Sequence, residues 1–89
     1  MRVRVEFIAP AGLVEGRQDI ELELPAGSSV RDLVAALVHR HGPQAGGLIL
    51  QPDGQTPYVD FIVGGRVVPY DHALRDGDEV AVLPPIHGG

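Results

Sequence analysis

Residues 28–38 have the sequence SSVRDLVAALV, which is the clearest helical pattern in the chain. Its apolar residues recur at the spacing of one helix face: Val30, Leu33, Val34, Leu37 and Val38. Ser29 can cap the amino end, and Asp32 follows three residues later, as in a capping box. Gly42-Pro43 then ends the helix. No other part of the chain has a convincing helical pattern, so one main helix is expected.

Two strands are predicted before this helix. Residues 2–7 and 19–24 each alternate apolar and charged side chains, as half-buried strands do. The apolar rows are Val3, Val5 and Phe7 in the first strand and Ile20, Leu22 and Leu24 in the second. If the strands pair antiparallel, the arginines of the first oppose the acidic residues of the second, which is a favourable cross-strand arrangement.

Three further strands are predicted after the helix. Residues 44–57 are rich in turn residues and indicate a long loop with room for a short strand or turn. Residues 58–63 and 66–68 form strands joined by Gly64-Gly65, a strong hairpin signal. After a turn at Asp76-Gly77, residues 79–83 form the last strand. The order ββαβββ favours an α+β roll of the β-grasp type, with a mixed sheet and one main helix.

Composition narrows the classes of function. The chain has 89 residues, which is one domain, a formal net charge of -5 and no cysteine; all seven of its cations are arginine. Acidic charge argues against non-specific nucleic-acid binding, which needs clustered cations. No run approaches the ~18 apolar residues of a membrane span, and no signal segment opens the chain. We therefore expect a cytoplasmic protein that binds neither nucleic acid nor membrane.

An independent active site is not expected. The four histidines lack ligand spacing, so no metal site is predicted, and the glycines form no phosphate-binding loop. Asp76, Asp78 and Glu79 could be taken for an acidic site, but an Asp-Gly-Asp sequence before a strand is more typical of a turn. No Ser-His-Asp arrangement can be assembled from the sequence.

The last six residues are Pro84-Pro85-Ile86-His87-Gly88-Gly89. We expect a domain over residues 1–83 and a flexible tail over residues 84–89, because prolines favour an extended chain and glycines gain nothing from packing. The tail is either a frayed end or a segment that presents its carboxylate to another protein's active site. Leu83 to Ile86 would anchor and aim it, and Phe7 is either core or part of a docking surface.

The run from Tyr70 to Gly89 resembles the C-terminal signature of the MoaD/ThiS family of ubiquitin-like sulfur carrier proteins, with the pattern Leu-x-Asp-Gly-Asp-Glu-Val followed by Pro-Pro-x-x-Gly-Gly. The resemblance implies that an adenylating activating enzyme of the MoeB/ThiF kind uses ATP to activate the Gly89 carboxylate, which becomes a thiocarboxylate, while Gly88 provides clearance. No cofactor is bound by the carrier itself. The implied role is that of the molybdopterin synthase small subunit, which delivers sulfur to a pterin precursor bound by a MoaE-like large subunit.

The resemblance also implies which residues contact partners. Phe7, Val67 and Leu83 match the family's docking patch, and Pro84, Pro85, Ile86 and His87 lead into the partner's active site. The chain departs from the pattern in a longer segment over residues 44–57, in Gly64-Gly65 where an Asn is usual, and in Ala11-Gly12 where an Arg-Glu pair is common. The alternatives are a carrier for cysteine, thiazole or tRNA thiolation, a ubiquitin-like modifier joined to lysines through Gly89, and a non-covalent interaction module.

Overall fold

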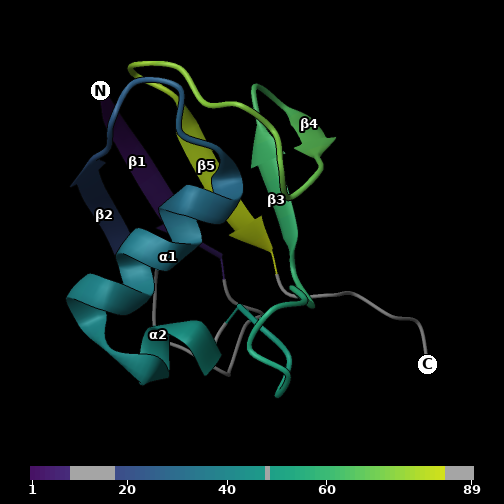
Figure 1. The fold of residues 1–89 in the computed structure, drawn as a ribbon. Coiled ribbons are helices and arrows are strands. Elements are labelled where there is room, and N and C mark those ends of the chain that lie inside the picture. The colour runs from purple at the N-terminus through teal and green to yellow at the C-terminus, as the bar shows by residue number, and fades with distance from the viewer. Residues whose placement is uncertain (9–17, 48, 84–89) are drawn as a thin grey trace.

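The computed structural model describes residues 1–8, 18–47 and 49–83. In chain order they form β1 (Arg2–Phe7), β2 (Gln18–Glu23), α1 (Val30–His41), α2 (Pro43–Gly47), β3 (Asp60–Val63), β4 (Arg66–Val68) and β5 (Glu79–Leu83). The strands make one sheet with the order β2-β1-β5-β3-β4, and α1 lies across one face of it (Figure 1). This is the predicted ubiquitin-like β-grasp fold.

The sheet is mixed, as expected. β1 pairs antiparallel with β2 and parallel with β5, and β3 pairs antiparallel with both β5 and β4. The parallel pair requires a crossover connection, which contains α1 and therefore places the helix on the sheet. The first and last strands of the chain thus lie side by side in the middle of the molecule.

The core lies between the sheet and α1. Val3 and Val5 of β1 and Val80 of β5 are fully buried, and α1 contributes the predicted apolar stripe. Its buried members are Val30, Leu33, Val34 and Leu37. Burial of such side chains contributes roughly 1.5–3 kcal/mol each, which is the main stabilisation of the fold.

The ends of α1 follow the sequence. Ser29 Oγ accepts a hydrogen bond from the Asp32 amide at 3.3 Å, and the Asp32 carboxylate accepts one from the Ser29 amide at 2.9 Å. The capping box is therefore confirmed. Gly42 adopts a φ of +86°, a conformation that side chains rarely allow, and its amide closes the helix on the Val38 carbonyl at 2.8 Å.

The segment after α1 differs from the expectation. Residues Pro43–Gly47 form the second, short helix α2 rather than a loop, and Leu50 makes an isolated bridge with Pro57. Ile49 is fully buried and its carbonyl accepts the amide of Tyr58 at 3.0 Å. Because Tyr58 is held by this segment, β3 begins at Asp60 and not at Tyr58 as predicted.

The two predicted turns are confirmed. Gly64 and Gly65 both have positive φ, at 61° and 79°, which is the requirement of the tight hairpin turn that joins β3 to β4. Asp76 and Gly77 form the turn before β5. The predicted tail, residues 84–89, lies outside the described residues and stays a prediction.

Candidate functional site

The face of the sheet opposite α1 carries an apolar row. Side chains alternate between the two faces of a strand, so the neighbours of the core residues point to this outer face. Val67 pairs with Ile62 across β4 and β3, and Ile62 pairs with Ala81 across β3 and β5. Val67 is 65% exposed, which is unusual for a branched apolar side chain, while Ile62 and Ala81 are half-buried. The row therefore presents apolar surface to the outside.

Leu83 extends this row toward the end of β5. It pairs with the exposed Asp60, lies on the same outer face and is half-buried. We call Val67, Ile62, Ala81 and Leu83 the outer apolar patch. Leu83 is also the last described residue, so the patch includes the point from which residues 84–89 continue. A partner that covers the patch would lie beside the start of that segment.

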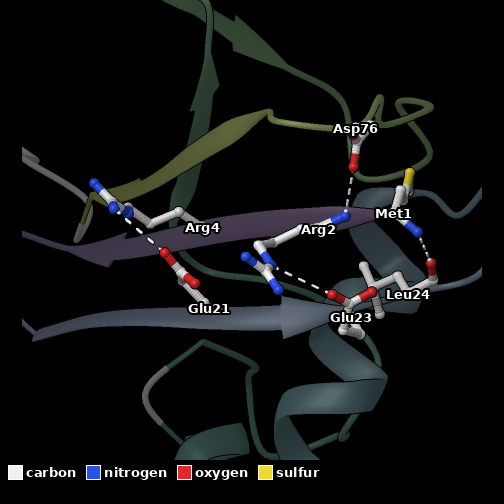
Figure 2. A network of polar contacts seen from close by, with 7 residues as sticks. All are labelled: Met1, Arg2, Arg4, Glu21, Glu23, Leu24 and Asp76. Atoms are coloured by element: carbon white, nitrogen blue, oxygen red, sulfur yellow. Dashed lines mark hydrogen bonds and ion pairs between the residues drawn. The ribbon is translucent and has the colours of Figure 1, made fainter.

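The other half of the outer face is charged. Arg2 of β1 lies 3.3 Å from Glu23 of β2, and Arg4 lies 3.4 Å from Glu21 (Figure 2). Arg4 also lies 3.4 Å from Glu79 of β5. The predicted opposition of arginines and acidic residues is thus confirmed. These groups are about half exposed or more, so each pair contributes on the order of 0–1 kcal/mol. Their main effect is to set a polar boundary beside the outer apolar patch.

The Asp-Gly-Asp turn uses its carboxylates for structure. Asp76 Oδ1 accepts the Arg2 amide at 2.8 Å, and Asp78 Oδ2 accepts the Arg75 amide at 2.8 Å. These contacts fasten the turn to the start of β1 and close it on itself. The interpretation of these residues as a turn rather than a chemical site is therefore supported by the geometry.

Tyr70 is a titratable side chain that contacts both α1 and the sheet. Burial raises the pKa of Tyr70, against an opposing effect of the Arg31 guanidinium 4.6 Å above its ring. Tyr70 also stacks on Phe61 at 5.7 Å, so it joins α1 to the sheet. Over the described ranges, no cluster of three or more His, Asp or Glu side chains has the arrangement of a metal site. Nor does any helix there have the length and apolar character needed to cross a bilayer.

The structure brings together only some of the predicted partner-binding residues. Val67 and Leu83 both belong to the outer apolar patch. Phe7 does not: it shares a face with Val3 and Val5, is half-buried, and packs against the core. Its register partner Val82 is buried on the same inner face, 4% exposed. The residues from Pro84 to Gly89 lie outside the described residues.

Ile62 and Ala81 were not predicted as site residues from the sequence. Both could have been found by applying the alternation of strand side chains to residues 60–63 and 79–83. Phe61 and Val63 flank Ile62 and pack in or against the core, and Val80 and Val82 do the same beside Ala81. Alternation therefore places Ile62 and Ala81 on the outer face. Both strands have apolar residues on both faces, so their sequences alone do not show which residues face the core.

Comparison with known proteins agrees with this architecture. In three dimensions the chain is similar to SAMP1 from Haloferax volcanii, with a TM-score of 0.80, 24% identity and full coverage of both chains, which shows the ubiquitin-like β-grasp fold. In sequence, the model of the ThiS family matches residues 4–89. The chain therefore belongs to the ThiS family, the group of ubiquitin-like sulfur carrier proteins that also contains MoaD.

Two relatives in sequence carry different functional names. A molybdopterin synthase sulfur carrier subunit of Chlamydomonas reinhardtii is 32% identical over 91 residues, and small archaeal modifier protein 3 of Haloferax volcanii is 35% identical over 94 residues. Each alignment covers 100% of both proteins. A protein named as a carrier and a protein named as a modifier are thus similar to this chain to nearly the same degree.

Proposed function

We propose that this protein carries sulfur on Gly89, whose carboxylate is adenylated and then converted to a thiocarboxylate. The observation that carries the proposal is the position of the outer apolar patch. Its member Leu83 ends β5, directly before the sequence Pro84-Pro85-Ile86-His87-Gly88-Gly89. An enzyme that docks on the patch is therefore close to the root of the segment on which it would act.

The proposed chemistry needs an activating enzyme, because a carboxylate is a poor acylating agent. An oxygen of the Gly89 carboxylate attacks the α-phosphorus of ATP, and pyrophosphate leaves. Hydrosulfide, HS⁻, then attacks the carbonyl carbon of the acyl adenylate, AMP leaves with the electron pair of the broken bond, and loss of the remaining S–H proton gives the thiocarboxylate. ATP is a substrate of an activating enzyme of the MoeB/ThiF kind, and the carrier itself holds no cofactor.

The chain's own residues would supply access and docking. Gly88 and Gly89 have no Cβ, so they fit a channel too narrow for other residues. Pro84 and Pro85 favour an extended backbone, and Ile86 and His87 would contact the channel walls. The patch residues Val67 and Leu83 would hold the partner, since apolar anchors concentrate at the centre of interfaces.

Adenylation can be tested by the release of pyrophosphate. The chain is mixed with ATP and an activating enzyme of a ThiS-family carrier, and pyrophosphate formation is followed over time. We expect release that depends on the chain, and none from a variant that lacks Gly88 and Gly89. The deleted residues follow the last strand, so the variant should keep the fold, which circular dichroism checks. Equal release by both proteins would contradict the assignment to Gly89.

We further propose that the acceptor is the pterin precursor of molybdenum cofactor and that the partner is a MoaE-like large subunit of molybdopterin synthase. The full-length match to the Chlamydomonas carrier subunit supports this choice. The thiocarboxylated chain, a large subunit and the precursor should together yield the dithiolene. If a known carrier subunit gives product in the same assay and this chain does not, the molybdopterin role is excluded while sulfur loading is unaffected.

A second function, protein modification, is favoured by the match to small archaeal modifier protein 3. In that case the activated Gly89 carbonyl is attacked by a lysine amine of a target, which forms an isopeptide bond and releases AMP. Such adducts have a higher mass and survive both denaturation and thiol reagents. Their presence in a lysate of cells that make the chain would support protein modification. If the chain were found only without attached proteins, the result would support the sulfur-carrier function alone.

A further inference from the structure

Among the described residues, β2 forms one edge of the sheet, and the register shows which of its backbone groups point away from β1. Met1 and Leu24 exchange two hydrogen bonds: the amino group of Met1 donates to the Leu24 carbonyl at 2.7 Å, and the Leu24 amide donates to the Met1 carbonyl at 2.8 Å. Bonded and non-bonded pairs alternate along an antiparallel ladder. The next pair, Arg2 with Glu23, is therefore non-bonded, and so is Arg4 with Glu21.

Contacts on the other side of β1 agree with this assignment. The Arg4 amide donates to the Asp78 carbonyl at 3.0 Å, and the Arg2 carbonyl accepts the Gly77 amide at 2.8 Å. The backbone groups of Arg2 and Arg4 thus point toward β5. The amides and carbonyls of their register partners, Glu23 and Glu21, therefore point away from β1, beyond the edge of the sheet. Within the described residues, these groups have no backbone hydrogen bond.

A groove of about 530 Å³ runs beside this edge. Its walls come from β2, from Arg2 of β1 and from α1, and α1 crosses the sheet next to β2 (Figure 1). The residues that matter are Glu21, Leu22 and Glu23 of β2 and Ala36, His39 and Arg40 of α1. Leu22 and Ala36 provide an apolar floor, and His39 and Arg40 are exposed on the helix side. Free backbone donors and acceptors therefore lie along a groove with an apolar base.

We propose that this groove binds an extended segment of a partner protein, which adds to β2 as a further strand and alternates basic with apolar side chains. A residue opposite Glu21 or Glu23 would share the outer face with that glutamate, which favours lysine or arginine. The residues between them would face α1 and pack on Leu22 and Ala36, which favours apolar side chains. Strand addition of this kind takes affinity from the backbone and specificity from alternate side chains.

The charge of the edge supports a basic segment. Arg2 and Arg4 are shared among three glutamates, and the side chains of Glu21 and Glu23 are 52% and 71% exposed. An additional cation would therefore meet incompletely balanced carboxylates. A second copy of β2 would instead place acidic side chains beside acidic side chains, which is unfavourable. The occupant that fits is a different chain.

The groove is separate from the surface assigned to the sulfur-carrier function. The order β2-β1-β5-β3-β4 places β2 at one edge and Val67 of β4 at the other. The β4 edge is a poorer template, because β4 has three residues and Pro69, which has no amide hydrogen, follows it. Both surfaces could be occupied at once, and the strand-addition proposal does not depend on the fate of Gly89.

The test uses an eight-residue peptide that alternates lysine and valine, with both ends blocked, and the full chain. Amide hydrogen exchange followed by NMR should show slower exchange at Glu21 and Glu23, by about tenfold or more at saturation, and no change at Val67. Two further peptides, N-methylated at every lysine or at every valine, distinguish antiparallel from parallel addition to β2. In an antiparallel addition the lysine amides would bond to Glu21 and Glu23, and in a parallel addition the valine amides would, so one of the two peptides must lose binding. A glutamate–valine peptide should bind at least about tenfold more weakly.

Two protein variants complete the test. Glu21→Pro removes an amide that the fold does not use, and an edge strand tolerates proline. Glu21→Gln keeps the amide and loses only the charge. We expect Glu21→Pro to weaken peptide binding by about tenfold or more and Glu21→Gln to weaken it less. If Glu21→Pro fails to fold, the N-methylated peptides decide. The proposal would be overturned if the amides of Glu21 and Glu23 were not protected from exchange, or if Val67 were protected instead. It would also be overturned if both N-methylated peptides bound as well as the unmethylated one.

Discussion

Ser29 fixes the start of α1 through one hydroxyl group. Its Oγ accepts the Asp32 amide, and the same hydroxyl lies 3.1 Å from the Asp32 carboxylate. Loss of an N-cap oxygen leaves a helix amide without a protein partner. We expect Ser29→Ala to lower the free energy of unfolding by about 1 kcal/mol in urea titrations. Ser29→Thr, which keeps the oxygen, should be close to the parent, and equal losses in both variants would contradict the capping role.

Val67 is the residue on which docking should depend most visibly. Its side chain is 65% exposed at the centre of β4, so a polar replacement should change the free energy of unfolding by no more than about 0.5 kcal/mol. We expect Val67→Asp to weaken binding to a molybdopterin synthase large subunit by about tenfold or more, measured by titration calorimetry. Val67→Thr has nearly the same shape and should have a smaller effect. Unchanged affinity in Val67→Asp would exclude the patch as the docking surface.

Phe7 lies on the inner face of β1 and packs against the core. Alternation in β1 placed it with Val3 and Val5, while family resemblance placed it on the docking patch with Val67. The structure follows the alternation, because register couples every side chain of a strand to one face. Alternation thus predicted the face on which Phe7 lies, and the contact of Phe7 with a partner stays a prediction.

At the scale of elements, the segment from α2 to the bridge at Pro57 was the least predictable. Gly46 and Gly47 are poor helix formers, yet they belong to α2. The reason is tertiary: α2 packs so closely on α1 that a Cβ at Gly46 would lie 3.2 Å from Val38 Cγ2. Packing between the two neighbouring helices therefore overrode local propensity. By contrast, α1, the Gly64-Gly65 hairpin and β5 carry strong local signals and were predicted.

Asp53 holds the turn within this segment. Its Oδ2 accepts the Thr56 hydroxyl at 2.6 Å, and its Oδ1 accepts the Thr56 and Gln55 amides at 2.9 and 2.8 Å. These three hydrogen bonds lower the pKa of the Asp53 carboxyl, and the bond from the Thr56 hydroxyl has the largest effect. Because the pKa of Asp53 is lower in the folded state than in the unfolded state, its hydrogen bonds stabilise the folded protein above the unfolded-state pKa. This stabilisation is lost as the pH falls through the folded-state pKa.

The role of the Thr56 hydroxyl can be measured directly. We expect Thr56→Val to raise the pKa of Asp53 toward the ordinary range of aspartate, as followed by carbon-detected NMR titration of the carboxyl group. Thr56→Ser, which keeps the hydroxyl, should leave the pKa low. An equally low pKa in Thr56→Val would mean that the two amide bonds alone account for the shift.

At the scale of the whole molecule, the fold joins elements from both ends of the chain at one place. β1 and β5 pair in the centre of the sheet, and β3 and β4 complete the outer apolar patch beside the end of β5. The strand order could be anticipated from the ββαβββ pattern. The composition of the patch could not, since Ile62 and Ala81 become neighbours only through the pairing of β3 with β5.

Sulfur carried on Gly89 would change the intact mass of the chain, which mass spectrometry measures. The full chain is incubated with an activating enzyme, ATP and a sulfur donor, beside a variant that lacks Gly88 and Gly89. We predict that the mass of the full chain rises by the difference between one sulfur and one oxygen atom, that fragmentation places the change on Gly89, and that the variant does not change. An unchanged mass under conditions that fully charge another ThiS-family carrier would contradict the claim.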